Sequence, residues 1–421
     1  MKVVSPSCGH AACEALTGVV QKYHAQVPWA LLRCLAARSL RAAAPFEVAI
    51  LAVWRRPPGA PPGQTWTGPS MRHGEVLPLE ESEEVSNAEK AYAEVLARLE
   101  SREAHRGVIE MFKASALAEL SDKRQLSLFL DAQNVAAWAP PTARHPDELL
   151  DGGLFDTDRG NGLWFLKHAC IDGNLGVTVH AGRRACRDAW LALPKTALQE
   201  KSYVAQQEVR DPLLDGAGRK VTLRVYVLMM AMALEAPSVV GRPGRREAFA
   251  LLRRDFLCRL HPRPYSQDAD PERHVLCAAG DFNGVGWGLG SDWPLRDQAW
   301  PGIQRMLAAC LGPFLRTLGR GKASAELVGT GALEFDLLGV DVLVDVRFRA
   351  WLIEVNLLPA LEPLPGDPAL TAQRGAVVED VLAAVLDPAL RSGCLAAAAD
   401  AQGAWEPLAS WKEEEDQGCP F

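Results

Sequence analysis

The sequence predicts a protein of the mixed α/β or α+β class, in which strands and helices follow one another without strict alternation. Apolar, β-branched runs at 163–166, 221–232 and 340–355 indicate strands, the last of them an antiparallel pair. Stretches rich in Ala, Leu and Glu at 88–120 and 379–386 indicate helices. A chain of 421 residues is long enough to bury more than one core.

Changes in composition along the chain divide it into four predicted segments. Residues 1–90 form an N-terminal domain and linker, with a strand at 48–54 and a Pro- and Gly-rich stretch at 57–63. Residues 91–212 and 213–393 form a central and a C-terminal unit. Residues 394–421 end in an acidic run and are expected to be a flexible tail.

Composition excludes several classes of protein. The net charge of −7 gives no bulk basicity for nucleic-acid binding, so an acidic partner would need a local basic patch. No run of 18 apolar residues is present, so we expect no membrane span. The ten cysteines are scattered without paired spacing, which favours reduced thiols and a cytoplasmic location.

The paired strands near residue 347 carry a candidate metal site. A turn centred between residues 347 and 348 would place Asp341 opposite Glu354 and Leu343 opposite Leu352. Asn356, two residues beyond Glu354, would point to the same face. Two carboxylates and an amide are ligands that suit Mg²⁺, which also binds substrate phosphates. The alternative is an edge hairpin with a solvated polar face.

A lysine at the end of the first strand is a candidate phosphate ligand. Lys167 precedes a loop that contains Gly173 and Gly176, where backbone amides and an ammonium group could hold phosphates. A plain β-turn with an exposed lysine is the alternative.

The strand at 221–232 begins with an unusual polar face. Lys220, Thr222 and Arg224 share one face, while Val221 and Leu223 share the other. Two cations on an otherwise apolar strand are costly to bury unless an anion such as a triphosphate or a carboxylate pairs with them. A half-exposed amphipathic strand is the alternative.

Six arginines lie between residues 242 and 259. Guanidinium groups suit carboxylates and phosphates, although a solvated loop would also explain most of them. Arg259 differs because it lies in an apolar stretch at 256–260.

Taken in order, these pieces resemble the tubulin–tyrosine ligase-like family of ATP-grasp amino-acid ligases. The resemblance extends from about Trp164 to Pro363, roughly half of the chain. Its most specific parts are the turn at 211–214 followed by Lys220 and the strand at 223–227, and the block from 335 to 359.

The resemblance implies an ATP-grasp fold in which ATP lies between two sheets, beside a smaller N-terminal domain. Lys167 and Lys220 would contact the phosphates and the nucleotide, and Arg224 and Arg259 would face the acyl phosphate and the acceptor carboxylate. The remaining nucleotide-binding positions would be Gly173, Gly176, Gln206, Gln207, Glu208, Val209 and Thr222. Mg²⁺ would be held by Asp341, Glu354 and Asn356, with Glu354 also counted among the catalytic residues.

The family's reaction activates a carboxylate of a protein, typically in the acidic tail of tubulin, as an acyl phosphate that a free amino acid then attacks. Tubulin or another acidic protein, a free amino acid, ATP and Mg²⁺ are therefore the expected partners, without nucleic acid or membrane. A cytoskeletal or ciliary association would follow from such an acceptor.

The chain departs from the family pattern at four places. Gly173 stands where a basic residue is usual, Thr222 where Asp is usual, and Gln207–Glu208 where Lys–Tyr is usual. The stretch from His274 to Cys277 keeps only the histidine of the family's His-Leu-Thr-Asn sequence. These departures support a second hypothesis, a catalytically degraded member that binds tubulin, another acidic partner or a nucleotide. A third hypothesis is a ligase that acts on a small peptide or metabolite.

Overall fold

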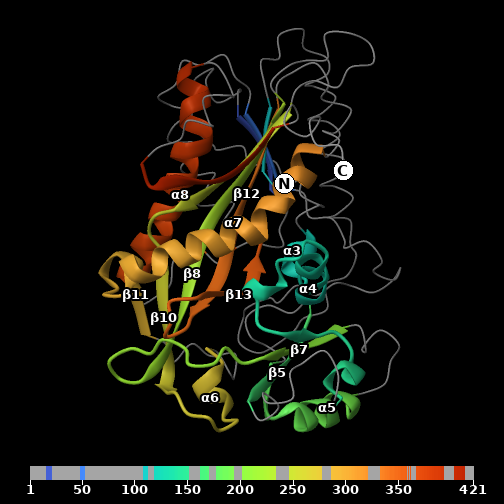
Figure 1. Ribbon diagram of the computed structural model, residues 1–421. Helices are drawn as coiled ribbons and strands as arrows, with labels where there is room; N and C mark the ends of the chain where they lie inside the picture. The colour runs from blue at the N-terminus through green and yellow to red at the C-terminus, as the bar shows by residue number, and fades with distance from the viewer. Residues whose placement is uncertain are drawn as a thin grey trace.

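A computed structural model describes the chain in fourteen stretches, and the following account is confined to them. They are residues 16–20, 48–52, 108–111, 118–150, 162–169, 177–193, 202–233, 246–276, 286–320, 332–357, 359, 361, 367–392 and 403–412. The described part is mixed α/β, as the sequence predicts, with one large sheet and a smaller four-stranded sheet beside it (Figure 1). None of its helices is long and apolar enough to cross a membrane.

The large sheet is built around two long antiparallel strands, β8 (Arg219–Ala233) and β12 (Ala332–Val344). Its central order is β11-β10-β8-β12-β13, and β9 extends it along β8 while β3 pairs in parallel with β12. The other strands are β3 (Val108–Met111), β9 (Arg246–Arg253), β10 (Leu257–Pro264), β11 (Gly286–Leu289), β13 (Ala350–Asn356) and β14 (Trp405–Lys412).

The small sheet has the order β4-β7-β5-β6, with antiparallel neighbours. Its strands are β4 (Thr142–Ala143), β5 (Leu163–His168), β6 (Thr178–Ala181) and β7 (Tyr203–Gln207), and α5 (Arg183–Leu191) packs on them. Short helices complete this part: α3 (Ala118–Ser121), α4 (Lys123–Ala132), η3 (Ala136–Trp138), η4 (Pro146–Leu149) and α6 (Pro271–His274). Helix α4 begins at Lys123 because the Asp122 carboxylate accepts hydrogen bonds from the backbone N–H groups of Arg124 and Gln125.

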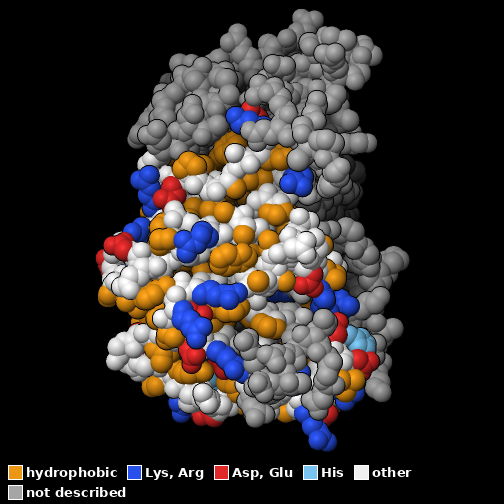
Figure 2. All heavy atoms as spheres, in the orientation of Figure 1, with side chains coloured by type: hydrophobic (Ala, Val, Ile, Leu, Met, Phe, Trp, Pro, Cys, Tyr) orange, Lys and Arg blue, Asp and Glu red, His pale blue; other side chains and the backbone are white. Residues whose placement is uncertain are grey.

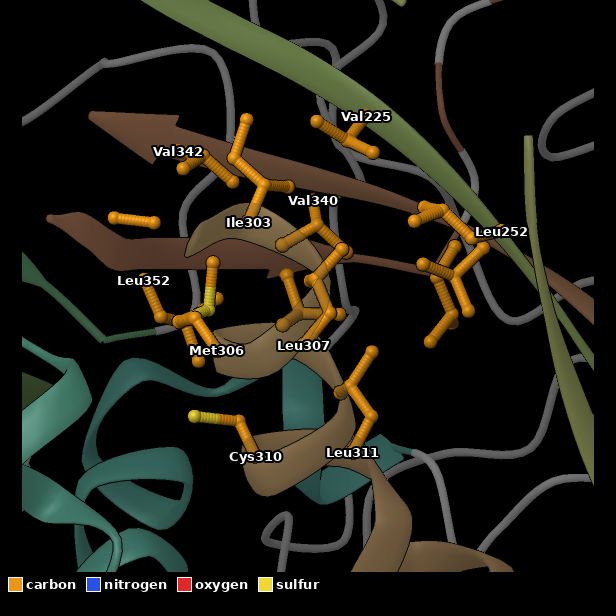
Figure 3. Close-up of a cluster of buried hydrophobic side chains, with 14 of the residues drawn as sticks. Val225, Leu252, Ile303, Met306, Leu307, Cys310, Leu311, Val340, Val342 and Leu352 are labelled. Atoms are coloured by element: carbon orange, nitrogen blue, oxygen red, sulfur yellow. The ribbon is translucent and has the colours of Figure 1, made fainter. Parts of the chain in front are cut away.

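Helix α7 (Arg296–Arg320), which follows the short η7 (Gly290–Asp292), covers one face of the large sheet. Its buried side chains recur at helical spacing and meet the apolar face of the central strands (Figure 3). Val221, Leu223 and Val225 belong to this core, so the prediction that they face away from Lys220 and Arg224 is confirmed. The opposite face of the same strands is thereby left for polar side chains.

The β12–β13 hairpin confirms one predicted pair and corrects another. Asp341 lies opposite Glu354 as expected, but Leu343 lies opposite Trp351 rather than Leu352, because a bulge interrupts the register beside Asp341. The bulge lets Leu352 and Val355, three residues apart, both reach the core.

Two segments are strands where the sequence predicts otherwise. Val108–Met111 lies inside the predicted helix at 88–120, yet it forms β3. Trp405–Lys412 lies inside the predicted flexible tail, yet it forms β14 on β9, with Trp405 buried. In both cases pairing with a distant strand overrides local composition.

The predicted helix at 379–386 is confirmed as part of the longer α8 (Pro368–Ser392). Residues 1–90 are described only at β1 (Leu16–Val20) and β2 (Val48–Ala52), which pair in parallel and confirm a strand at 48–52.

Candidate functional site

The centre of the candidate site is a buried carboxylate held by two arginines. Arg224 of β8 lies opposite Asp341 of β12, and its Nε and Nη2 donate to the two carboxylate oxygens at 2.5 and 3.1 Å. Arg259 of β10 places Nη2 2.5 Å from Asp341 Oδ1. Burial opposes ionisation, but the two guanidinium groups hold the pKa of Asp341 well below its usual range. The anion that the two strand cations require therefore includes a carboxylate of the protein itself.

Glu354 and Asn356 lie beside Asp341 on the same face, as predicted. The Asn356 Nδ2 is 3.4 Å from Glu354 Oε1 and 3.2 Å from the Gly339 carbonyl oxygen. Lys123, at the start of α4, places Nζ 3.6 Å from Glu354 Oε2. A close approach of Gly339 supports this packing, because a Cβ there would lie 2.7 Å from Pro359 Cβ and 3.1 Å from two Arg224 atoms.

The donor set fits Mg²⁺, although it is engaged by cations in this arrangement. Asp341, Glu354 and the oxygen of Asn356 are hard ligands on one face, and a half-turn of the amide would present that oxygen. No group of three or more His, Cys, Asp or Glu forms a metal cluster in the described stretches. The nearby arginines and lysine outnumber the two carboxylates, so the site as it stands favours an anion such as a phosphate.

Lys167 of the small sheet faces this cluster across the space between the sheets. Burial and the nearby Lys123 and Lys220 ammonium groups lower its pKa to about 8, against the attraction of Glu354 and Asp341. Its Nζ donates to Gln206 Oε1 at 2.6 Å. A cavity of about 290 Å³ adjoins this pair, and its walls include Lys123, Thr142, Leu352 and Ile353.

Lys220 is engaged by protein groups rather than left open to a ligand. Its Nζ donates to Glu208 Oε1 at 2.7 Å and to His274 Nδ1 at 2.9 Å, and it lies 4.7 Å from the centroid of the Tyr265 ring. His274 Nε2 is 2.7 Å from the Asp268 carbonyl oxygen, so Nε2 donates and Nδ1 accepts from Lys220. Burial alone would raise the pKa of Glu208, but the charge and hydrogen bond of Lys220 lower it. Glu208 therefore joins the end of the small sheet to β8 of the large one.

Thr222 has a protein partner too, since its Oγ1 is 3.1 Å from His261 Nε2. Burial, Lys220 and Arg259 lower the pKa of His261 to about 3, so this imidazole is neutral at physiological pH. Gln207, 6% exposed, lies opposite Trp164, and Val209 is buried just beyond β7.

The structure thus brings together most of the residues that the sequence singles out, in two groups. Arg224, Arg259, Asp341, Glu354, Asn356 and Lys167 form the first, and Lys220, Glu208 and Thr222 with their histidines form the second. Gly173, Gly176, Arg242 and Arg245 lie outside the described residues. The rest of the arginine segment forms β9 and the start of β10, where Arg253 donates to Asp380 Oδ2 at 2.8 Å. The functional roles assigned to all of these residues stay predictions.

Sequence reasoning missed Lys123 and His261 as members of the site, and it noted His274 only as part of a departure from the family pattern. Lys123 follows an N-cap aspartate at the start of a helix, which is a local signal but says nothing about Glu354, 231 positions further along the chain. No residue near either histidine in the sequence indicates its partner, so only tertiary contact reveals that His274 meets Lys220 and His261 meets Thr222.

Comparison with known proteins points in one direction. Residues 305–393, which include Asp341, Glu354 and Asn356, match the sequence model of the Tubulin-tyrosine ligase family. Probable tubulin polyglutamylase TTLL9 of Mus musculus is 29% identical over 184 residues, and the protein of the same name from Bos taurus is 27% identical over 187 residues. Each match covers 40% of this chain and 35% of the relative, so the chain spans about a third of the length of the curated relatives that it matches.

Proposed function

Since this chain is a divergent member of the tubulin-tyrosine ligase family, we propose that it is an ATP- and Mg²⁺-dependent ligase that joins a free amino acid to a carboxylate of tubulin. The observation that carries the proposal is the convergence of Asp341, Glu354 and Asn356 on one sheet face, beside Arg224 and Arg259.

The charges of the site support phosphoryl transfer. Arg259 is 7% exposed, and its Nε has no hydrogen-bond partner among the described residues, so a donor remains for an anionic ligand. Lys167 and Lys123 lie toward the same centre. Mg²⁺ held by the oxygen ligands would offset negative charge on the phosphoryl group, a task that the cationic side chains share.

The proposed reaction has two steps. An oxygen of the acceptor carboxylate attacks the γ-phosphorus of ATP, which releases ADP and leaves an acyl phosphate. The amine of the free amino acid then attacks the acyl carbon, so that the amide bond forms while phosphate and a proton leave. Arg224 and Arg259 would orient the acceptor and stabilise the oxyanion, which is positioning and electrostatic work.

We propose glutamate as the donated amino acid, because both relatives are named as probable tubulin polyglutamylases. This choice rests on the names of the relatives.

The test is a comparison of Glu354→Gln with Glu247→Gln. Their side chains are 17% and 16% exposed, but Glu247 lies in β9 beside Lys412. Purified protein is incubated with tubulin, Mg-ATP and free amino acids, and the tubulin tails are read by mass spectrometry. We expect a discrete ATP-dependent addition that falls by about 10²–10³ in E354Q and is unchanged in E247Q. An active E354Q would disprove the metal assignment.

A second function, nucleotide or tubulin binding without catalysis, is favoured because two expected ligand-binding residues already have protein partners. Lys220 forms an ion pair with Glu208, and Asp341 forms ion pairs with Arg224 and Arg259. Binding of Mg-ATP without any ligation to tubulin, in a preparation where a known ligase works, would support this alternative.

A further inference from the structure

Four exposed arginines from three separate segments lie in the turn between β12 and β13 or within one helical turn of a residue that contacts it. The β7–β8 connection runs beside this turn, because Asp211 accepts a hydrogen bond from Val346 N at 2.9 Å and Pro212 bridges to Asp345. Helix α7 approaches from the other side, where a Cβ at Gly302 would lie 2.8 Å from the Phe348 carbonyl oxygen. The four residues, called here the arginine corner, are Arg210, Arg305, Arg347 and Arg349.

The arginine corner is strongly cationic in a chain of net charge −7. Arg210 precedes Asp211 and Arg347 follows Val346, so the two arginines occupy neighbouring positions on adjoining segments. Arg305 lies one helical turn beyond Gly302 on the same side of α7. Within the described residues, Arg210, Arg305 and Arg347 have no side-chain hydrogen bond or ion pair, and Asp211 is the exposed acid beside them. Figure 2 shows several basic side chains gathered on the face that carries α7.

The turn that presents these arginines is held rigidly. Asp345 Oδ1 accepts from the backbone N–H groups of Arg347 and Arg349 at 2.9 and 3.0 Å, and its Oδ2 accepts from Trp351 Nε1 at 3.0 Å. Arg349 lies over the Trp351 ring at 4.1 Å and donates to the Ala137 carbonyl oxygen of η3. A rigid guanidinium loses little entropy when it binds a carboxylate.

Backbone conformation marks the same place. Asp211 and Phe348 are non-glycine residues with φ of 48° and 58°, a region that side chains with a Cβ seldom adopt. Such residues gather where the surrounding structure serves a function, and here both lie in the segments that carry Arg210 and Arg347.

We propose that the arginine corner binds an acidic peptide segment, rich in Glu and Asp, outside the catalytic centre. Guanidinium forks pair with carboxylates in two-point geometry, and the corner offers arginines without lysines. Asn356 lies seven positions beyond Arg349 along β13, roughly 23 Å of strand, which an extended peptide of about seven residues can span. The assignment of this peptide as the acceptor tail rests on the proposed function, but the binding itself does not.

The test is fluorescence anisotropy of a labelled Glu-rich peptide with the full chain, without nucleotide. Arg210→Glu/Arg347→Glu is compared with Arg184→Glu/Arg316→Glu, which makes the same change in net charge at exposed arginines of α5 and the distant part of α7. We expect about tenfold weaker binding in the first pair and less than about twofold in the second, since each exposed charge pair contributes modestly. The neutral pair R210Q/R347Q gives the same readout if the reversed charges impair folding.

Equal weakening in both charge-reversed pairs would mean general electrostatics and would overturn the proposal, as would unchanged binding in R210E/R347E. A single-stranded oligonucleotide of matched charge serves as the competing ligand. If it binds more tightly than the peptide, and R210E/R347E weakens its binding to the same degree, the ligand of the arginine corner would be a nucleic acid and the proposal would be wrong. The E354Q variant separates this inference from the proposed function, because it should bind the peptide normally while it ligates nothing.

Discussion

Replacing Glu208 and Lys220 singly and together measures the buried connection between the two sheets. Lys220 is 2% exposed and the Glu208 side chain 7%, so either partner alone would be a nearly uncompensated charge in the interior. Breaking a buried pair typically costs about 3–5 kcal/mol, whereas replacing both partners with groups of similar shape is often close to neutral. Lys220→Met also leaves His274 Nδ1 without its donor, which adds about 1–3 kcal/mol.

We therefore expect E208Q to lower the free energy of unfolding by about 3–5 kcal/mol and K220M by about 1–3 kcal/mol more than that. The double variant should lose clearly less than the sum of the two. Urea denaturation at neutral pH, followed by circular dichroism, gives all four corners of the cycle. Additive losses, with a coupling energy below about 0.5 kcal/mol, would refute the claim that these two groups stabilise each other.

The same variants test whether Lys220 contacts the nucleotide, as the family resemblance implies. If the ammonium group of Lys220 is fully engaged by Glu208 and His274, it does not contact ATP. The affinity of K220M for ATP, measured under native conditions, should then be close to that of the parent chain. A large loss of ATP affinity in K220M, with the protein folded, would restore Lys220 as a nucleotide ligand.

The pH dependence of stability that Glu208 contributes has a definite sign. Because the pKa of Glu208 is lowered in the folded state, its stabilisation is present above the ordinary Glu pKa and is lost as pH falls through the lowered value.

Three further predictions concern single residues. Gly339→Ala should lower the free energy of unfolding by about 1–3 kcal/mol, because the new Cβ would meet Pro359 and an Arg224 side chain that Asp341 holds in place. Gly375→Ala is the control, since a Cβ there would have nothing within 4 Å and should leave stability unchanged or raise it. Urea denaturation measures both. The affinity for a phosphate-bearing nucleotide should fall as pH rises through about 8, where Lys167 loses its charge, and Lys167→Arg should remove this fall; a pH-independent affinity in the parent chain would contradict the role of Lys167. Asp336 is 3% exposed with Oδ1 unpaired among the described residues, and burial raises its pKa well above the usual value, so stability should decline by about 1.4 kcal/mol per pH unit above the ordinary Asp pKa. Asp336→Asn should flatten that slope in thermal melts, and an identical slope in the variant would show that another group causes it.

The polar faces of the strands were predictable because side-chain direction alternates along any strand. Lys220, Thr222 and Arg224 share a face, and Asp341 lies opposite Glu354, as the spacing predicts. The predicted register is wrong by one residue near the turn, where Leu343 lies opposite Trp351. The bulge at residue 353 adds one residue to β13 and so brings Asp341 opposite Glu354 again, and no local signal in the sequence indicates that bulge.

The partners of the charged residues were not predictable, because they lie far apart in the chain. The sequence states that two strand cations need an anion, but it leaves open whether a ligand or the protein supplies it. In the structure Lys220 pairs with Glu208, 12 residues away in the sequence, and Arg224 pairs with Asp341, 117 residues away. Strands β3 and β14 were missed for the same reason, since the strand that each one pairs with is distant in sequence.

The sequence by itself thus determined the mixed fold class, the alternation of each strand and the resemblance at the 335–359 hairpin, all of which depend on periods of a few residues. Only the tertiary structure decided which charges neutralise one another, where the two sheets are joined and how three distant segments bring four arginines to one corner. Those outcomes depend on contacts between elements that are far apart in the chain, such as α7 and the central strands, and sequence spacing alone does not set the distances between them.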